Sequence, residues 1–167
     1  MTLTELLIGQ LEREAARTRR TLQEVPTGKD DWKPHDKSMP LGRLAGLVAS
    51  MPSWVPLIVD QESLELNPQG GSQYRQPQTS ELAHVHDDHV AKAIESLRRT
   101  KDDYLLTTTW RLTMNGKPVM EQLRHEVLAD TFLHLAHHRG QLTVYLRMNE
   151  AKVPSVYGPS ADDQRFL

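Results

Sequence analysis

Histidines are concentrated in two short stretches of the chain. Of the eight histidines, three lie between residues 83 and 89, and three lie between residues 134 and 138. Residues four apart on a helix lie one above the other, so His134 and His138 can present two imidazoles to one ion. Imidazole nitrogen is a common ligand of zinc and suits nickel as well. The spacing makes His134 and His138 candidate metal ligands, and two hydrogen-bonded core histidines are the alternative.

The other histidines fit a metal site less well. His84 and His86 are two residues apart and cannot share a helix face, whereas His86 and His89 are three apart and can. Nothing nearby supplies further ligands, so a partly solvated helix face is the simpler interpretation of this stretch. We expect His137, rotated about 60° from His134 around the helix, to point toward a neighbour or solvent.

Composition limits the classes of protein and of site. The chain has 167 residues and no cysteine, which predicts one domain over residues 1–167 and leaves imidazole and carboxylate as metal ligands. The net charge of −2 predicts no nucleic-acid binding. We find no basic leader and no stretch near the roughly 18 apolar residues of a membrane span. We therefore expect a cytoplasmic protein that is neither exported nor embedded in a membrane.

Hydrophobic periodicity predicts four long helical segments that could position these residues. The predicted helices cover residues 3–24, 39–60, 79–99 and 120–149, and residues 62–78 are expected to form a loop. Pro52 and Pro56 predict a break near Met51 in the second helix. Asn115-Gly116 follows a β-prone run and is a strong signal for a β-hairpin. The pattern indicates an all-α protein, a four-helix bundle with a small β-hairpin before the last helix.

Several segments resemble the DinB-like family of metal-binding four-helix bundles. The resemblance covers nearly the whole chain and is carried by residues 32–35, 38–45, 110–116, 134–147 and 153–162. It implies a bundle with a crossover link, a homodimer, and a divalent metal held by three histidines. Two of these histidines correspond to His134 and His138, with Arg139 and Gln141 in the same signature, where they could orient a ligand or pin the helix.

The family's third histidine corresponds to Leu47 in this chain. A replacement ligand could come from His35, from the histidines of residues 84–89, or from Asp130, one turn before His134. An ordinary carboxylate pairing with a neighbour is the other interpretation of Asp130. With leucine in place of the third histidine, occupancy of the site by zinc or nickel depends on a replacement ligand, because two imidazoles alone bind a metal weakly.

Two functions follow as expectations. The first, implied by the resemblance, is a metal-dependent hydrolase or a thiol-dependent transferase with a degenerate histidine site. The second is a non-catalytic bundle for ligand binding or dimer assembly, without metal. The apolar residues Trp54, Val55 and Leu57 after the helix break, together with the resemblance, predict a homodimer, and a small-molecule ligand fits either function.

Overall fold

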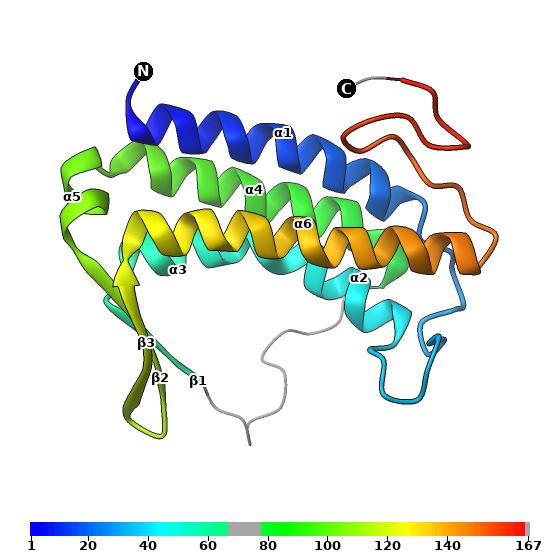
Figure 1. Ribbon diagram of the computed structural model, residues 1–167, viewed down its shortest axis with the longest axis horizontal. Helices are drawn as coiled ribbons and strands as arrows, with labels where there is room; N and C mark the ends of the chain where they lie inside the picture. Colours follow the sequence, from blue (N-terminus) through cyan, green and yellow to red (C-terminus); the bar gives the residue numbers. More distant parts are fainter. Residues whose placement is uncertain (67–77, 166–167) are drawn as a thin grey trace.

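The computed structural model describes residues 1–66 and 78–165 and consists of long helices with a small sheet at one end (Figure 1). The first helix, α1, spans Leu3–Gln23 and begins with the predicted capping box. The Thr2 hydroxyl accepts the Glu5 amide at 3.1 Å, and the Glu5 carboxylate accepts the Thr2 amide at 2.7 Å. These two bonds satisfy donors that a helix start otherwise leaves unpaired.

The second helical segment is interrupted where its prolines predict. It consists of α2 (Leu41–Ser50), a 3-10 turn (Met51–Ser53) and α3 (Trp54–Asp60). Pro52 lies in the 3-10 turn, where its missing backbone donor interrupts the α-helix, and Pro56 lies in the first turn of α3, where a missing donor is tolerated. The combined stretch Leu41–Asp60 has the length and mean hydropathy of a membrane span, contrary to the expectation from the sequence, but 67% of it is buried inside the protein.

Two further long helices complete the helical part. Helix α4 (Leu82–Arg99) follows a 3-10 turn at Thr79–Glu81, and α6 (Arg124–Met148) is the longest helix; the short α5 (Asp102–Thr107) lies between them in sequence. Helix α4 packs against α1 and α3, and α6 packs against α1, α2 and α3. Bonds from His86 to the Ala49 carbonyl and from Ser96 to Asp60 show that α4 runs in the same direction as α2 and α3.

The sheet corrects the predicted fold class. Strand β1 (Ser63–Leu66) pairs in parallel with β2 (Thr109–Met114), and β2 pairs antiparallel with β3 (Lys117–Leu123) through the predicted Asn115-Gly116 turn. A three-stranded mixed sheet beside the helices makes the protein a mixed helix-and-sheet fold, so the all-α prediction was wrong. Strand β1 was missed because its four residues gain their structure from pairing with a strand about 50 residues away. The rest of the predicted loop, residues 67–77, lies outside the described residues.

The core is divided into two apolar clusters along the length of the helices. One cluster contains Leu11 and Trp110 near the sheet, and the other contains Leu44 and Leu142 toward the C-terminal end of α6. The Trp110 indole donates to the Leu57 carbonyl at 3.2 Å, which ties β2 to α3. Together the clusters hold α6 against the other long helices, and α6 carries the candidate site.

Candidate functional site

His134 and His138 lie one turn apart on α6, as their spacing predicts. Their Nε2 atoms are 2.8 Å apart and their ring centroids 4.6 Å apart. His134 is exposed and His138 is half-buried, so the pair faces the surface and does not replace core side chains. The structure thus brings the two predicted ligands together and leaves their Nε2 atoms converging on one point.

Gln141 connects this pair to a third imidazole. Its side-chain oxygen lies 2.8 Å from His138 Nδ1, and its side-chain nitrogen lies 3.1 Å from His137 Nε2. The rings of His137 and His138 are 5.1 Å apart with an interplanar angle of 62°. His137 therefore belongs to the cluster, although its position on the helix wheel predicts a separate direction. We call His134, His137, His138 and Gln141 the histidine cluster.

The histidine cluster favours neutral imidazole at His134. Partial burial, followed by the nearby charges of His138 and His137, lowers the pKa of His134 below its usual range. A metal ligand must be neutral imidazole, because a protonated ring has no free nitrogen lone pair. His134 therefore keeps a nitrogen available for a metal or a hydrogen bond over a wider pH range than an isolated histidine does.

The residues considered as a third ligand do not complete a metal site. Within the described residues, no group of three histidine or carboxylate side chains could hold an ion. His35 lies in an exposed loop, where its Nδ1 accepts the Lys37 amide, and Asp130 is exposed. Leu47 is half-buried and packs against an apolar cluster. Neither His35 nor Asp130 therefore completes a three-ligand group with the histidine pair within the described residues.

His86 has a structural position instead of the solvated one expected. It is fully buried, and its two ring nitrogens lie 3.4 Å from the Ala49 carbonyl and 3.3 Å from the Ala15 carbonyl. Burial lowers its pKa, so the ring is neutral inside the core. His84 faces Asp88 at the surface. Within this stretch His86 therefore connects α4 to two other helices, and the described residues form no group of three metal ligands.

The separation of the two imidazole nitrogens is close to the separation that a divalent ion requires. Two nitrogens bound to zinc at about 2.0–2.1 Å in tetrahedral geometry lie about 3.3 Å apart. The observed separation of 2.8 Å is that of a hydrogen bond, so the rings must part by about half an ångström to admit an ion. Exposed side chains can make this movement by rotamer adjustment. The pair therefore fits a two-nitrogen site with open positions, and it does not fit the three-histidine centre implied by the resemblance.

The opposite side of α6 carries a buried polar network that sequence reasoning missed. Arg139 is 1% exposed and Glu14 2% exposed, and their side chains are joined at 2.6 Å. Arg139 also donates to the Thr18 hydroxyl at 3.0 Å and to the Tyr157 hydroxyl at 2.6 Å. The Tyr157 hydroxyl donates to Glu14 at 2.9 Å. We call Glu14, Thr18, Arg139 and Tyr157 the arginine network.

A signal for this network is present in the sequence. Glu14 and Thr18 fall on the same helical stripe as Leu7, Leu11 and Leu22, so a carboxylate interrupts an otherwise apolar face. A buried carboxylate requires a charged or hydrogen-bonding partner. That requirement predicts a partner for Glu14 on a neighbouring helix. The partner is Arg139, so of the two roles considered for Arg139 the structure favours the one that fixes α6 in place.

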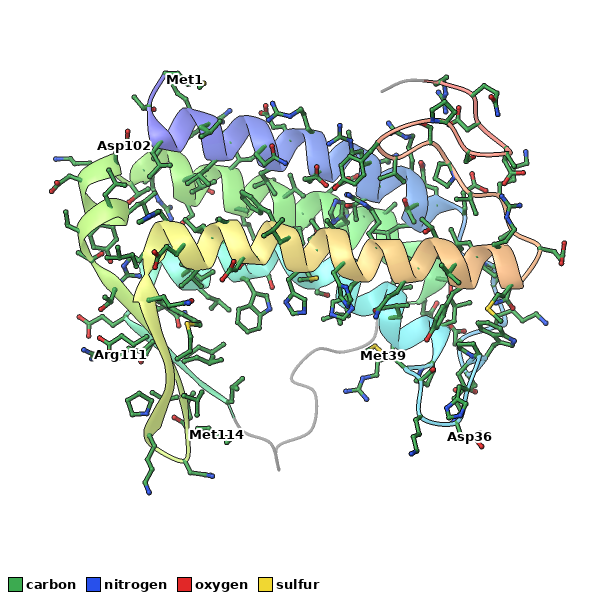
Figure 2. All side chains as sticks on the ribbon, viewed as in Figure 1. Met1, Asp36, Met39, Asp102, Arg111 and Met114 are labelled. Carbon is green, nitrogen blue, oxygen red and sulfur yellow. The ribbon has the colours of Figure 1, made fainter. Side chains whose placement is uncertain are left out.

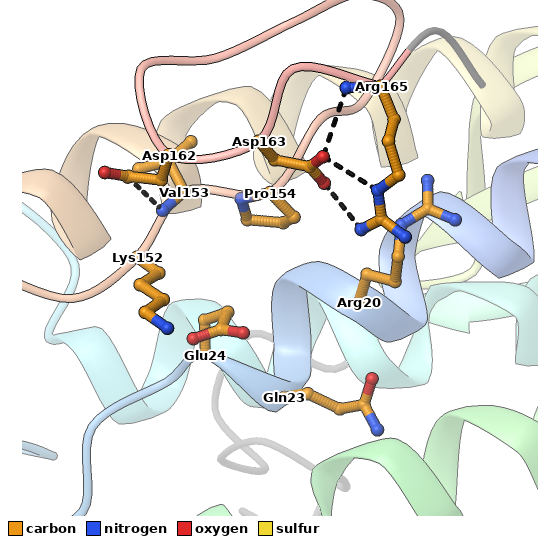
Figure 3. Close-up of a pocket in the computed structure, with 9 residues that line it drawn as sticks. All are labelled: Arg20, Gln23, Glu24, Lys152, Val153, Pro154, Asp162, Asp163 and Arg165. Atoms are coloured by element: carbon orange, nitrogen blue, oxygen red, sulfur yellow. Dashed lines mark hydrogen bonds and ion pairs between the residues drawn. The ribbon is translucent and has the colours of Figure 1, made fainter.

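A pocket of about 360 Å³ lies beyond the arginine network, between the end of α1 and the C-terminal segment (Figure 3). Charged side chains dominate its lining, among them Arg20, Glu24, Lys152 and Asp163. The Asp163 carboxylate already accepts a hydrogen bond from the Arg165 guanidinium, at 2.7 Å. No residue that lines this pocket belongs to the histidine cluster.

The protein is a mixed helix-and-sheet fold with a pair of histidines in contact on its last long helix. The sequence profile of the DinB family matches residues 1–165, and the chain belongs to this family. A DinB-like protein from Bacillus cereus ATCC 10987 has a similar fold, with a TM-score of 0.69 and 21% identity over 92% of this chain and 97% of that one.

A second similar structure is a DinB-like protein, YjoA, from Bacillus subtilis. It has a TM-score of 0.67 and 16% identity, and the match covers 96% of this chain and 99% of that one. At these identities the two structures support the fold and give no information on activity. No curated protein matches the chain.

Proposed function

We propose that this DinB-family protein binds a divalent metal ion, zinc or nickel, weakly through His134 and His138. The observation that supports the proposal best is the convergence of the two Nε2 atoms at the surface of α6, 2.8 Å apart. Imidazole nitrogen suits both metals. The lowered pKa of His134, which arises from partial burial and its histidine neighbours, favours the neutral ring, the form that binds a metal.

A metal held by two side chains has open coordination positions. An ion in such a site lowers the pKa of a bound water or thiol and so creates a nucleophile near neutral pH. We extend the proposal to this chemistry, that of a hydrolase or of a transferase using a low-molecular-weight thiol, with a small molecule filling the open positions. Within the chain, His134 and His138 would hold the ion.

The second candidate is a non-catalytic protein in which the histidines bond only to one another. It is favoured by the half-buried Leu47, which packs in an apolar cluster, and by the short contact between His134 and His138, which already satisfies both Nε2 atoms. Metal content separates the two candidates when measured on protein purified without a histidine tag. Near-stoichiometric zinc or nickel, or metal-free protein that binds added zinc, supports the first, and metal-free protein that does not bind added zinc supports the second.

Replacing Leu47 with histidine tests the geometry of the first candidate. If α2 faces the histidine pair as the family pattern implies, Leu47→His adds a third nitrogen, and zinc affinity should rise at least about tenfold. Without metal the variant should lose roughly 1–3 kcal/mol, because a partly buried imidazole replaces a packed leucine. Leu47→Asn is the control, since it adds a polar group of similar size without an imidazole. Calorimetric titration giving equal affinities in all three proteins would contradict the proposed geometry.

We further propose a cytoplasmic homodimer, whose interface lies on α6 and not at the apolar residues after the helix break. Val55 is fully buried and so is not available as an interface residue, and the half-buried Trp54 ring lies 6.4 Å from the Trp110 ring within the core. Exposed apolar side chains occur instead on α6, at Leu133, Val144 and Met148, which share a helix face. Light scattering should give twice the monomer mass of 19.0 kDa, and a monomer at micromolar concentration would contradict the proposal.

A further inference from the structure

Gln141 occupies an unusual position within the histidine cluster, because its amide group lies between two imidazoles. Its oxygen faces His138 Nδ1 at 2.8 Å, and its nitrogen faces His137 Nε2 at 3.1 Å. An amide oxygen only accepts hydrogen bonds, and an amide nitrogen only donates them. The two contacts therefore determine which ring nitrogens carry protons.

The proton positions follow from these directions. His138 must carry its proton on Nδ1 in order to donate to the Gln141 oxygen, so in the neutral ring its Nε2 has a free lone pair. That lone pair points at His134 Nε2, 2.8 Å away. His134 is then the donor in this contact and carries its proton on Nε2 in the metal-free protein. Binding of an ion at His134 Nε2 requires this proton to move to Nδ1 of the same ring, which frees the Nε2 lone pair. His137 accepts at Nε2 and therefore carries its proton on Nδ1.

We propose that Gln141, held in orientation by His137, is a positioning residue that fixes His138 as the Nδ1-protonated tautomer and so directs its Nε2 lone pair at the ligand position beside His134. The inference deepens the proposed metal site and rests on it for its functional meaning, but the tautomer itself is a property of the metal-free protein. Residues that bond to the second nitrogen of a metal-binding histidine fix its tautomer and raise its basicity in this way.

This arrangement gives a role to Gln141 and His137, the two side chains of the histidine cluster that are not proposed as metal ligands. Metal affinity depends on a ligand ring being held with its lone pair in place before the ion arrives. Gln141, three residues after His138 on the helix, supplies the acceptor. His137, four residues before Gln141, holds the Gln141 amide in a single orientation. With only two ligands in the site, the orientation of each one contributes a large share of the affinity.

The tautomer can be measured directly by nitrogen NMR of the histidine side chains, because protonated and unprotonated ring nitrogens have well-separated shifts. At about pH 8, above the usual imidazole pKa of about 6.5, the wild-type protein should show His138 protonated at Nδ1. Gln141→Leu should give a mixture of both tautomers at His138, and Gln141→Glu should restore the Nδ1-protonated form, because a carboxylate accepts from the same nitrogen. Assignment uses the single variants His137→Phe and His134→Phe.

Zinc titration supplies the functional readout. Gln141→Leu should weaken zinc binding about 10–100-fold, Gln141→Glu should bind at least as tightly as the wild type, and His137→Phe should weaken binding by less than Gln141→Leu. Gln23→Leu, at an exposed glutamine at the end of α1, is the matched control and should leave affinity unchanged. All variants should melt within a few degrees of the wild type, because the substituted side chains are exposed or partly exposed.

The outcomes separate the inference from the proposed function. Wild-type His138 protonated at Nε2 would overturn the inference, since the amide would then be reversed. Equal zinc affinity in the wild type and Gln141→Leu would also overturn it, while leaving the metal site intact. Absence of zinc binding in every protein, with a His138 tautomer that still depends on Gln141, would support the positioning role and overturn the metal site.

Discussion

Helix α6 carries two polar clusters that are adjacent in sequence and opposite in construction. The arginine network places Arg139 and Glu14 in the interior, each no more than 2% exposed, whereas the neighbouring histidine cluster lies at the surface. Side chains extend from α6 along its whole length (Figure 2). Successive residues on a helix are rotated by about 100°, so His138 and Arg139 face different surroundings. The comparison suggests a division of roles, in which the buried side holds the helix and the exposed side is free for chemistry.

The two clusters should therefore respond differently to substitution. A buried ion pair becomes a large liability when one partner is removed, because the other charge stays behind without compensation. An exposed hydrogen bond between side chains contributes little to stability, since water replaces either partner. Changes to the arginine network should thus lower stability, and changes to the histidine cluster should alter ligand binding with little effect on stability.

The largest effect is expected from Arg139→Met. The substitution removes the buried guanidinium that pairs with the Glu14 carboxylate and leaves Arg17 and Tyr157 as its partners. The cost in free energy of unfolding should therefore lie at the lower end of the range for a broken buried pair, about 3 kcal/mol. A loss of that size lowers the melting temperature by about 10 °C in a domain of this length. Chemical denaturation followed by circular dichroism measures both quantities.

A second variant tests whether the loss comes from the unpaired charge. Glu14→Gln combined with Arg139→Met removes both charges, so the double variant should recover part of the stability lost by Arg139→Met alone. If the stability losses of Arg139→Met and Glu14→Gln simply add up in the double variant, the two residues act independently. That result would contradict the arginine network.

The next effect is a dependence of stability on acid pH through Glu14. Burial by itself raises the pKa of Glu14, but the hydrogen bond and charge of Arg139, with bonds from Tyr157 and Arg17, outweigh burial and lower it below the model-peptide value of 4.5. The unfolded chain then binds the proton more readily, so this stabilisation is present above about pH 4.5 and is lost as the pH falls through the folded-state pKa.

Denaturation curves between pH 3 and pH 7 measure this contribution. The wild-type protein should lose stability below about pH 4.5, and Glu14→Gln should lose less over the same range because it has no proton to gain. Aspartates elsewhere contribute equally to both proteins, so the difference between the two curves isolates Glu14. Parallel curves would mean that Glu14 has the same pKa folded and unfolded.

A smaller effect is expected outside both clusters, at the hairpin turn. Asn115 and Gly116 have φ angles of 52° and 72°, values that a β-branched side chain adopts only with strain. Gly116→Val should lower the melting temperature by a few degrees, because the turn lies away from the helical core. Gly116→Asn is the matched control and should behave close to the wild type. Complete loss of folding would show that the hairpin is required for the core.

The comparison also shows which features could be predicted from the sequence. Helix α1 and the break before α3 depend on local signals, a capping box and two prolines, and both were predicted. The spacing of His134 and His138 is likewise local, because one helix turn brings the rings together. Features that depend on contacts within one element were therefore accessible.

Features that depend on contacts between distant segments were not accessible from local pattern. Strand β1 forms against β2, and the predicted start of the last helix at residue 120 was early because β3 continues to Leu123 before α6 begins. Partners of Arg139 come from α1 and from Tyr157 in the C-terminal segment. The partners of β1 and of Arg139 lie on other elements, tens of residues away for β2 and Glu14 and 18 residues away for Tyr157. Periodicity within one element could not identify them.

The smallest effect on stability is expected at the histidine pair itself. The double variant His134→Ala, His138→Ala removes one exposed and one half-buried ring, and its melting temperature without metal should lie within about 2–4 °C of the wild type. Differential scanning fluorimetry in the presence of a chelator measures the change. A loss comparable to that of Arg139→Met would remove the distinction between the two sides of α6.

Zinc titration of the same double variant tests the central claim most directly. The wild-type protein should bind zinc in calorimetry and gain thermal stability as zinc rises above the dissociation constant, because the ion binds the folded state preferentially. The double variant should show neither heat of binding nor a thermal shift. Zinc binding of equal affinity in both proteins, or no binding in the wild type, would contradict the account of His134 and His138 as the metal site.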